Sequence, residues 1–231
     1  MLLQSLLPHK KQIERQPNPL DILYNYYKNG FIEKLGGNII FEKDLKQFDQ
    51  IFKGNISRRK IFELINNKKI LEDQPRLLFM SIIIWGSLEI YEGEINPKAI
   101  TQLEKMFSSQ GQIERVVSLT SKPLMNGDIT DAYRKFTLSQ CGIQYISKYF
   151  YFLTYNHLDK YAIILDGRIL KSLTFLSLDK SDQDLINIIM PIFNSRYPSY
   201  QSYINFMHRI AKKISCETYE LEYYLKTSKL D

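Results

Sequence analysis

The chain has 231 residues, of which 44% are hydrophobic, only 10 are glycine and 8 are proline, and its formal net charge is +6. This composition excludes an intrinsically disordered protein. The chain is long enough for one large domain with a sizeable core. Two cysteines are too few for a disulfide framework in a chain of this length. The three histidines lie far apart in the sequence, which disfavours a structural zinc site or a histidine-based catalytic site. We expect no metal and no cofactor.

In chain order, the predicted elements are almost all helices. Apolar spacing of three and four predicts a helix over 18–30, ended by Asn-Gly, and residues 36–38 read as a turn within a short hairpin arm at 36–43. A helix over 57–67 begins with Ser57 as its N-cap, and a buried central helix over 74–87 stops at Gly86. Further helices are predicted at 96–111, 111–119, 128–138, 143–154, 166–177, 181–194, 197–213 and 216–226.

Targeting and membrane signals are weak. The longest apolar run, residues 77–85, is far shorter than the roughly 20 residues that span a bilayer. The first 16 residues lack the charge order, long apolar segment and cleavage site of a signal peptide. We therefore expect a soluble cytoplasmic protein with no membrane partner and no obligate protein partner.

The positive charge is concentrated in the N-terminal third. Residues 1–70 contain 13 Lys and Arg against 7 Asp and Glu, whereas residues 71–231 contain 18 of each. The runs "SRRK" at 57–60 and "NNKK" at 66–69 contribute to this excess. A basic patch suits a polyanion such as nucleic acid, although on charge alone a solvated basic face without function is equally compatible.

Lys148 is an ionisable residue in strongly apolar surroundings. Its predicted helix, 143–154, also carries Ile146, Tyr149 and Phe150 and should be mostly buried. Burial disfavours the charged ammonium, and only a neutral amine can attack an electrophilic carbon to form a Schiff base.

Asp166 follows "AIIL" and precedes "GRILKSL", where a new helix is predicted to begin. It can serve as an N-cap that stabilises the helix by about 1 kcal/mol. It can also be a carboxylate that the helix dipole keeps ionised, ready to deprotonate a nucleophile or to stabilise a cationic sugar. The two roles are compatible, since a capping aspartate can also face a ligand.

An ordered set of motifs connects these residues to a known family. The set comprises "SRRKIFEL" (57–64), "IIIWGSLEIYEG" (82–93), "DAYRKF" (131–136), "SKYFYF" (147–152) and "AIILDGRI" (162–169). Over about 57–170 the chain resembles the helix-hairpin-helix DNA glycosylases, in which a lysine on the second hairpin helix precedes an essential aspartate at similar spacing. It looks most like a bacterial branch, the 8-oxoguanine DNA glycosylase OGG-fold proteins. One departure is that Gln144 stands near the position of the expected second glycine of the hairpin, after Gly142.

The resemblance implies an all-α fold, with one helix-hairpin-helix glycosylase-like domain over 1–231, two lobes around a cleft and at most a minor β-hairpin. The N-terminal basic region would cover about 1–70, and the hairpin and catalytic segment about 140–170. Lys148 would be the nucleophile and Asp166 the activating carboxylate. Gly142, Gln144, Ser147, Arg58, Arg59 and Lys60 would contact DNA, and Trp85, Gly86 and Phe150 would form the base pocket, although plain core packing explains Trp85 slightly better.

The function implied is a DNA glycosylase with AP-lyase activity that acts on double-stranded DNA, with oxidised guanine as the default base and a modified phage base as an alternative. Two other classes stay open. One is a DNA-binding protein of a defence or repair system that retains the fold without catalysis, and the other is a helical interaction protein with no nucleic-acid role.

Overall fold

The computed structural model describes residues 6–26, 42–67, 73–90, 97–108, 111–180, 186–187 and 197–228. Within these ranges the chain is built from helices and one pair of very short strands, so the predicted all-α class is confirmed. The helices are η1 (Leu7–His9), α2 (Lys10–Glu14), α4 (Glu42–Phe52), α5 (Arg58–Asn66), α7 (Pro75–Ile90), α8 (Pro97–Phe107), α9 (Gln112–Met125), α10 (Ile129–Lys135), α11 (Ile143–Thr154), α12 (Gly167–Lys180), α14 (Tyr197–Ile214) and α15 (Thr218–Thr227).

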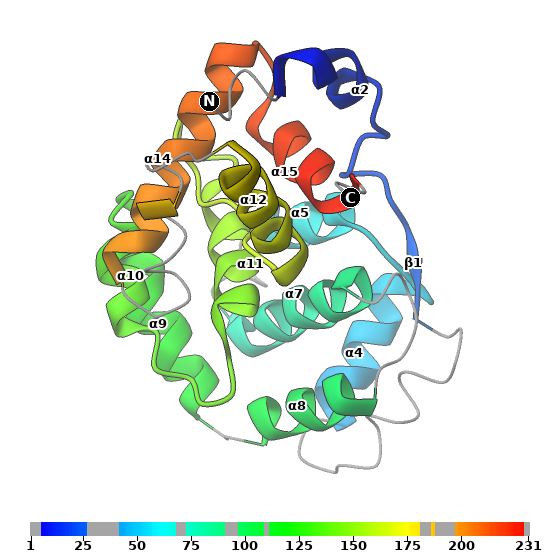
Figure 1. Cartoon of the computed structure of the whole chain (residues 1–231). Helices are drawn as coiled ribbons and strands as arrows, with labels where there is room; N and C mark the ends of the chain where they lie inside the picture. The colour runs from blue at the N-terminus through cyan, green and yellow to red at the C-terminus, as the bar shows by residue number, and fades with distance from the viewer. Residues whose placement is uncertain are drawn as a thin grey trace.

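Helix α7 lies at the centre of the fold (Figure 1). Its residues 77–88 are all buried, as expected for a helix that is apolar on every face. Helices α4, α5, α8, α9 and α11 all contact it. The helix continues through Gly86 to Ile90, so the predicted stop at Gly86 is wrong. An isolated glycine costs a helix about 1 kcal/mol, and packing on every side of α7 offsets that cost.

Helix α11 is the second buried helix, and its bounds match the prediction of 143–154. Residues 145–154 are all buried and include five aromatic side chains. The helix packs against α5, α7 and α9.

Ser57 caps α5 as predicted, because its hydroxyl accepts a hydrogen bond from the backbone N–H of Lys60 at 3.2 Å.

The predicted helix over 18–30 is wrong for its described part, residues 18–26. The Asn18 side chain accepts a hydrogen bond from the N–H of Leu20 at 3.0 Å, a local turn that competes with a helix. The chain then forms strand β1 (Tyr24–Asn25), which pairs antiparallel with β2 (Asn55–Ile56). Most of the predicted hairpin at 36–43 and of the predicted helix at 181–194 lies outside the described residues.

Candidate active site

Lys148 lies in the middle of α11 and is fully buried. Its side chain crosses α7 at Gly86, where a β-carbon would overlap Cδ of the lysine. The lysine Nζ donates a hydrogen bond to the carbonyl oxygen of Gln144, one turn earlier, at 3.4 Å. Gly86 is therefore the position at which α7 makes room for the lysine.

Asp166 is the last residue before α12 and is 2% exposed. Its Oδ1 accepts hydrogen bonds from the backbone N–H groups of Arg168 at 3.0 Å and Ile169 at 3.1 Å, which confirms that it caps the helix. Its Oδ2 is buried and has no hydrogen-bond partner among the described residues. One oxygen thus holds the helix start, and the other is buried without a partner among the described residues.

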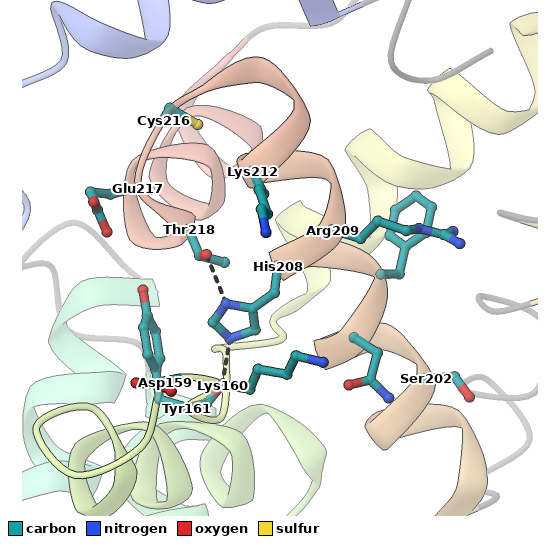
Figure 2. Close-up of a pocket in the computed structure, with 12 residues that line it drawn as sticks. Asp159, Lys160, Tyr161, Ser202, His208, Arg209, Lys212, Cys216, Glu217 and Thr218 are labelled. Atoms are coloured by element: carbon teal, nitrogen blue, oxygen red, sulfur yellow. Dashed lines mark hydrogen bonds between the residues drawn. The ribbon is translucent and has the colours of Figure 1, made fainter.

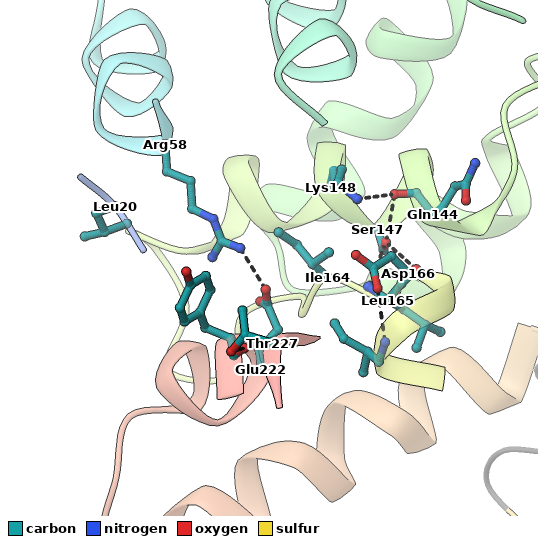
Figure 3. A network of polar contacts seen from close by, with 12 residues as sticks. Leu20, Arg58, Gln144, Ser147, Lys148, Ile164, Leu165, Asp166, Glu222 and Thr227 are labelled. Carbon is teal, nitrogen blue, oxygen red and sulfur yellow. Dashed lines mark hydrogen bonds and ion pairs between the residues drawn. The ribbon is translucent and has the colours of Figure 1, made fainter. Parts of the chain in front are cut away.

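Ser147 fixes Lys148 and Asp166 on adjacent stretches of backbone (Figure 3). Its Oγ accepts a hydrogen bond from the N–H of Leu165 at 3.0 Å and lies 3.4 Å from the carbonyl oxygen of the same residue. Ser147 directly precedes Lys148, and Leu165 directly precedes Asp166. These contacts therefore fix the backbone at Lys148 relative to the backbone at Asp166.

The segment 161–166, which ends at Asp166, is buried and has no regular secondary structure. Buried backbone groups need hydrogen-bond partners, and here side chains provide them. The Thr154 hydroxyl accepts from the N–H of Ala162 at 2.8 Å, and the hydroxyls of Tyr200 and Tyr203 donate to the carbonyls of Ile163 and Ile164 at 2.8 and 2.9 Å. A ring nitrogen of His208 lies 2.9 Å from the carbonyl oxygen of Tyr161.

The hairpin before α11 places the predicted DNA contacts in different settings. Gly142 is the exposed N-cap of α11, with extended backbone and no side-chain cap. Gln144 is half-buried, and Ser147 is fully buried by its contacts with Leu165. The left-handed turn residue is Gln140, with φ of 65°, so this hairpin turns without using glycine at that position. Gly142 provides no side-chain cap for the first N–H groups of α11, and an uncapped helix N-terminus suits an anion.

The run "SRRK" divides into three environments. Arg58 is 1% exposed and forms a 2.8 Å ion pair with Glu222, itself fully buried, an arrangement that does not favour the predicted contact of Arg58 with DNA. Arg59 is exposed and paired with Asp21. Lys60 donates to the carbonyl of Asn55 at 2.7 Å. Sequence reasoning missed Glu222, whose partner lies 164 positions earlier in the chain.

The predicted pocket residues do not lie together: Trp85 and Gly86 belong to α7 and pack against one side of α11, and Phe150 belongs to α11 and points to another side. Trp85 is buried, packs edge-on against Phe152, and has the Arg58 guanidinium 5.2 Å from its ring centre. Its indole nitrogen has no hydrogen-bond partner among the described residues. Gly86 contacts Lys148. Phe150 instead packs on the other side, against Tyr133, Phe136 and Tyr200. Gly86 thus contacts one of the two candidate residues and Trp85 precedes it in α7, whereas Phe150 is a core residue on a separate face of α11.

A basic surface that sequence reasoning missed lies beside the hairpin turn. The Gln102 side chain of α8 donates to the carbonyl of Gln140 at 2.8 Å. Lys98 and Lys105, two turns apart on α8, line the same open depression of about 540 Å³. Their spacing of seven places both lysines on one face of a helix, and this is the sequence signal that could have found them.

Within the described residues, no group of three or more His, Cys, Asp or Glu side chains is arranged to hold a metal ion. None of the described helices combines the length and the apolar character needed to cross a bilayer.

A model of one protein family, described as "Putative 8-oxoguanine DNA glycosylase OGG-like protein", matches residues 34–225 of the chain. The match covers the helices from α4 to α15 with the exception of a few terminal residues, and it includes both Lys148 and Asp166. No curated protein and no solved structure shows significant similarity to the chain.

Proposed function

The chain belongs to the OGG family, and from this membership we propose that it is a DNA glycosylase with AP-lyase activity that excises oxidised guanine from double-stranded DNA. The observation that supports the proposal is the Ser147–Leu165 contact, which joins the residue before Lys148 to the residue before the capped Asp166. The oxidised guanine rests on the family description alone.

In the proposed reaction, the target base leaves the stack at a cost of a few kcal/mol. The amine of Lys148 forms a bond to C1′ of the deoxyribose while the glycosidic bond breaks, and the departing base takes the proton that the attacking nitrogen loses. Ring opening gives a Schiff base, removal of a C2′ proton expels the 3′ phosphate, and water hydrolyses the imine. Asp166, through its unbonded Oδ2, stabilises the positive charge that develops on the sugar.

The DNA would dock at the hairpin. The uncapped N-terminus of α11 at Gly142 offers backbone N–H groups to one phosphate. Lys98 and Lys105 of α8, next to the hairpin turn, supply positive charge for neighbouring phosphates. These residues replace Arg58 as the proposed source of phosphate contacts.

The burial of the candidate pair favours one alternative, a DNA-binding protein that retains the fold without catalysis. Lys148 is fully buried and Asp166 is 2% exposed, so neither reaches solvent in the free protein. The catalytic proposal therefore requires DNA binding to open the contact between α11 and the residues that cover it. The non-catalytic alternative requires no such movement.

Borohydride trapping tests the proposal. We expect the full chain, mixed with a duplex that contains 8-oxoguanine opposite cytosine, to give a covalent adduct and a cleaved strand. Lys148→Gln should abolish the adduct, while Lys171→Gln, which changes an exposed lysine on α12, should trap as well as wild type. A wild-type chain that binds the duplex without forming an adduct or an abasic product would support the non-catalytic alternative.

Asp166→Asn separates the catalytic role of Asp166 from its capping role. Asparagine caps helices about as well as aspartate, so the variant should stay folded. Loss of the carboxylate should lower the rate of base excision by about 100-fold or more. Single-turnover excision and urea unfolding, measured on the same preparation, distinguish this outcome from simple destabilisation of α12.

A further inference from the structure

A second pocket lies apart from Lys148 and Asp166, between α14, the start of α15 and the turn at 159–161 (Figure 2). We call it the α14–α15 groove. Its volume is about 850 Å³, and neither candidate catalytic residue lines it. Pockets that bind small molecules typically measure about 300–1,000 Å³, so the groove is large enough for a ligand of nucleotide size.

Three cations line the α14–α15 groove. Lys160 comes from the turn, and Arg209 and Lys212 come from neighbouring positions on α14. Within the described part of the chain, none of the three forms an ion pair. The Arg209 guanidinium lies 5.6 Å from the centre of the Phe206 ring, which holds it at the groove wall. Figure 2 shows Lys212 and Lys160 reaching into the same space from opposite sides of His208.

The negative charges at the groove offset these cations only in part. Glu217 and Asp159 also line it. The Glu217 carboxylate accepts a hydrogen bond from the backbone N–H of Glu220 in a capping box, so its charge is directed at the start of α15. Clustered like charges in a concave surface raise the local concentration of the opposite ion, and three cations favour an anion with several negative oxygens.

His208 connects two walls of the groove. One ring nitrogen lies 2.9 Å from the carbonyl oxygen of Tyr161, and the other lies 3.0 Å from the Thr218 hydroxyl. The imidazole thus fixes the turn that carries Lys160 relative to α15. Because these contacts keep the turn in place, the backbone positions that carry Lys160 and Lys212 are fixed before any ligand binds, which reduces part of the entropy cost of binding.

We propose that the α14–α15 groove binds phosphate groups, held by Lys160, Arg209 and Lys212. The groups can come from a free polyphosphorylated molecule or from a nucleic-acid strand, because both present the same oxygens. The site is separate from the proposed excision reaction, and its test requires no DNA cleavage.

Isothermal titration of the full chain with inorganic pyrophosphate tests this proposal. We expect saturable binding of one pyrophosphate per chain. Lys160→Gln and Lys212→Gln should each weaken binding at least 10-fold, whereas Lys213→Gln, which alters an exposed lysine next to Lys212 on the same helix, should change it less than 2-fold. Absence of saturable binding, or equal effects of Lys212→Gln and Lys213→Gln, would overturn the proposal.

A competition arm identifies the source of the phosphates. A single-stranded ten-residue oligothymidylate that displaces pyrophosphate in a Lys212-dependent manner indicates a nucleic-acid strand. An oligothymidylate that leaves pyrophosphate bound indicates a free phosphorylated ligand. Because pyrophosphate binding is measured without a damaged duplex, its failure leaves the glycosylase proposal intact, and a failed trapping experiment leaves the groove proposal intact.

Discussion

At the scale of single residues, the candidate site depends on the crossing of a lysine and a glycine. The Lys148 side chain fills the space that a β-carbon would take at Gly86. Two helices can pack closely at a glycine, which has no side chain. At Gly86 the space is filled by the aliphatic part of the Lys148 side chain. Gly86 is thus proposed as a positioning residue for Lys148.

Gly86→Ala tests that role. The added methyl group overlaps Cδ of Lys148, and overpacking of this kind costs about 1–3 kcal/mol. A better helix propensity offsets about 1 kcal/mol of that cost, so we expect a folded protein with a displaced lysine. Borohydride trapping should fall at least 10-fold, while the urea midpoint should shift only slightly. Gly167→Ala, at a position with open space around it, should trap normally; equal trapping by both variants would exclude positioning by Gly86.

At the scale of elements, α14 holds the segment that leads to Asp166. Tyr200, Tyr203 and His208 each contact a carbonyl of that segment, at Ile163, Ile164 and Tyr161 respectively. Burial raises the pKa of the Tyr200 and Tyr203 phenols well above 10, so both remain protonated donors throughout the pH range of interest. A buried segment without regular secondary structure is therefore stabilised by one face of α14.

Tyr203→Phe should remove one donor and leave the Ile164 carbonyl buried without this partner. We expect the free energy of unfolding to fall by about 1–3 kcal/mol, as measured by urea denaturation. Tyr219→Phe, a half-buried tyrosine on α15, should change it by less than about 0.5 kcal/mol. A neutral Tyr203→Phe would mean that water or a backbone shift satisfies the carbonyl.

Helix α8 carries a prediction about DNA binding. Lys98→Gln and Lys105→Gln should each weaken binding to any duplex sequence, because phosphate contacts carry no sequence information. Each should also reduce the slope of log K against log salt by about 0.9, as measured by fluorescence anisotropy between low and moderate salt. Lys122→Gln on α9, an exposed lysine away from the hairpin turn, is the control. Unchanged slopes for both α8 variants would exclude this face as a DNA contact.

What the sequence predicts well is local. The bounds of α11 follow from its apolar pattern and from Gly142 before it, and the capping role of Asp166 follows from its position before a helical run. What it misses depends on distant partners. Nothing in "SRRK" distinguishes Arg58 from Arg59, since the burial of Arg58 depends on Glu222. Likewise, residues 24–25 form a strand only because residues 55–56 are available to pair with them.

At the scale of the whole molecule, α15 joins the C-terminal part of the chain to the rest. It packs against α2, α12 and α14. The Ser172 hydroxyl of α12 donates to the carbonyl of Leu225 at 2.6 Å, and Glu222 pairs with Arg58 of α5. The last described helix therefore contacts elements from both the beginning and the middle of the described chain.

The free energy of unfolding should depend on pH through the protonation of His208. Burial lowers the pKa of His208 below 6.5, and the Lys160 charge lowers it further, while the Tyr161 carbonyl and Glu217 act in the opposite direction. The unfolded chain then binds more protons than the folded one, so the free energy of unfolding decreases as the pH falls from about 6.5 through the folded pKa. His208→Gln should flatten this decrease, as measured by urea denaturation between pH 7 and 5. An identical pH profile for both proteins would assign the effect to other groups.

The buried Arg58–Glu222 pair should be the interaction whose loss affects the whole fold most. The guanidinium lies 5.2 Å from the ring centres of both Trp85 and Tyr151, and the ion pair excludes water almost completely. Removing one partner of a buried pair leaves an uncompensated charge and costs about 3–5 kcal/mol, whereas apolar replacement of both is often neutral. Glu222→Leu and Arg58→Met should therefore each destabilise the protein strongly, and the double variant should be more stable than either single one. A double-mutant cycle in urea measures this coupling. Additive effects of the two substitutions would show that each charge is held by its other neighbours and that the pair does not join α5 to α15.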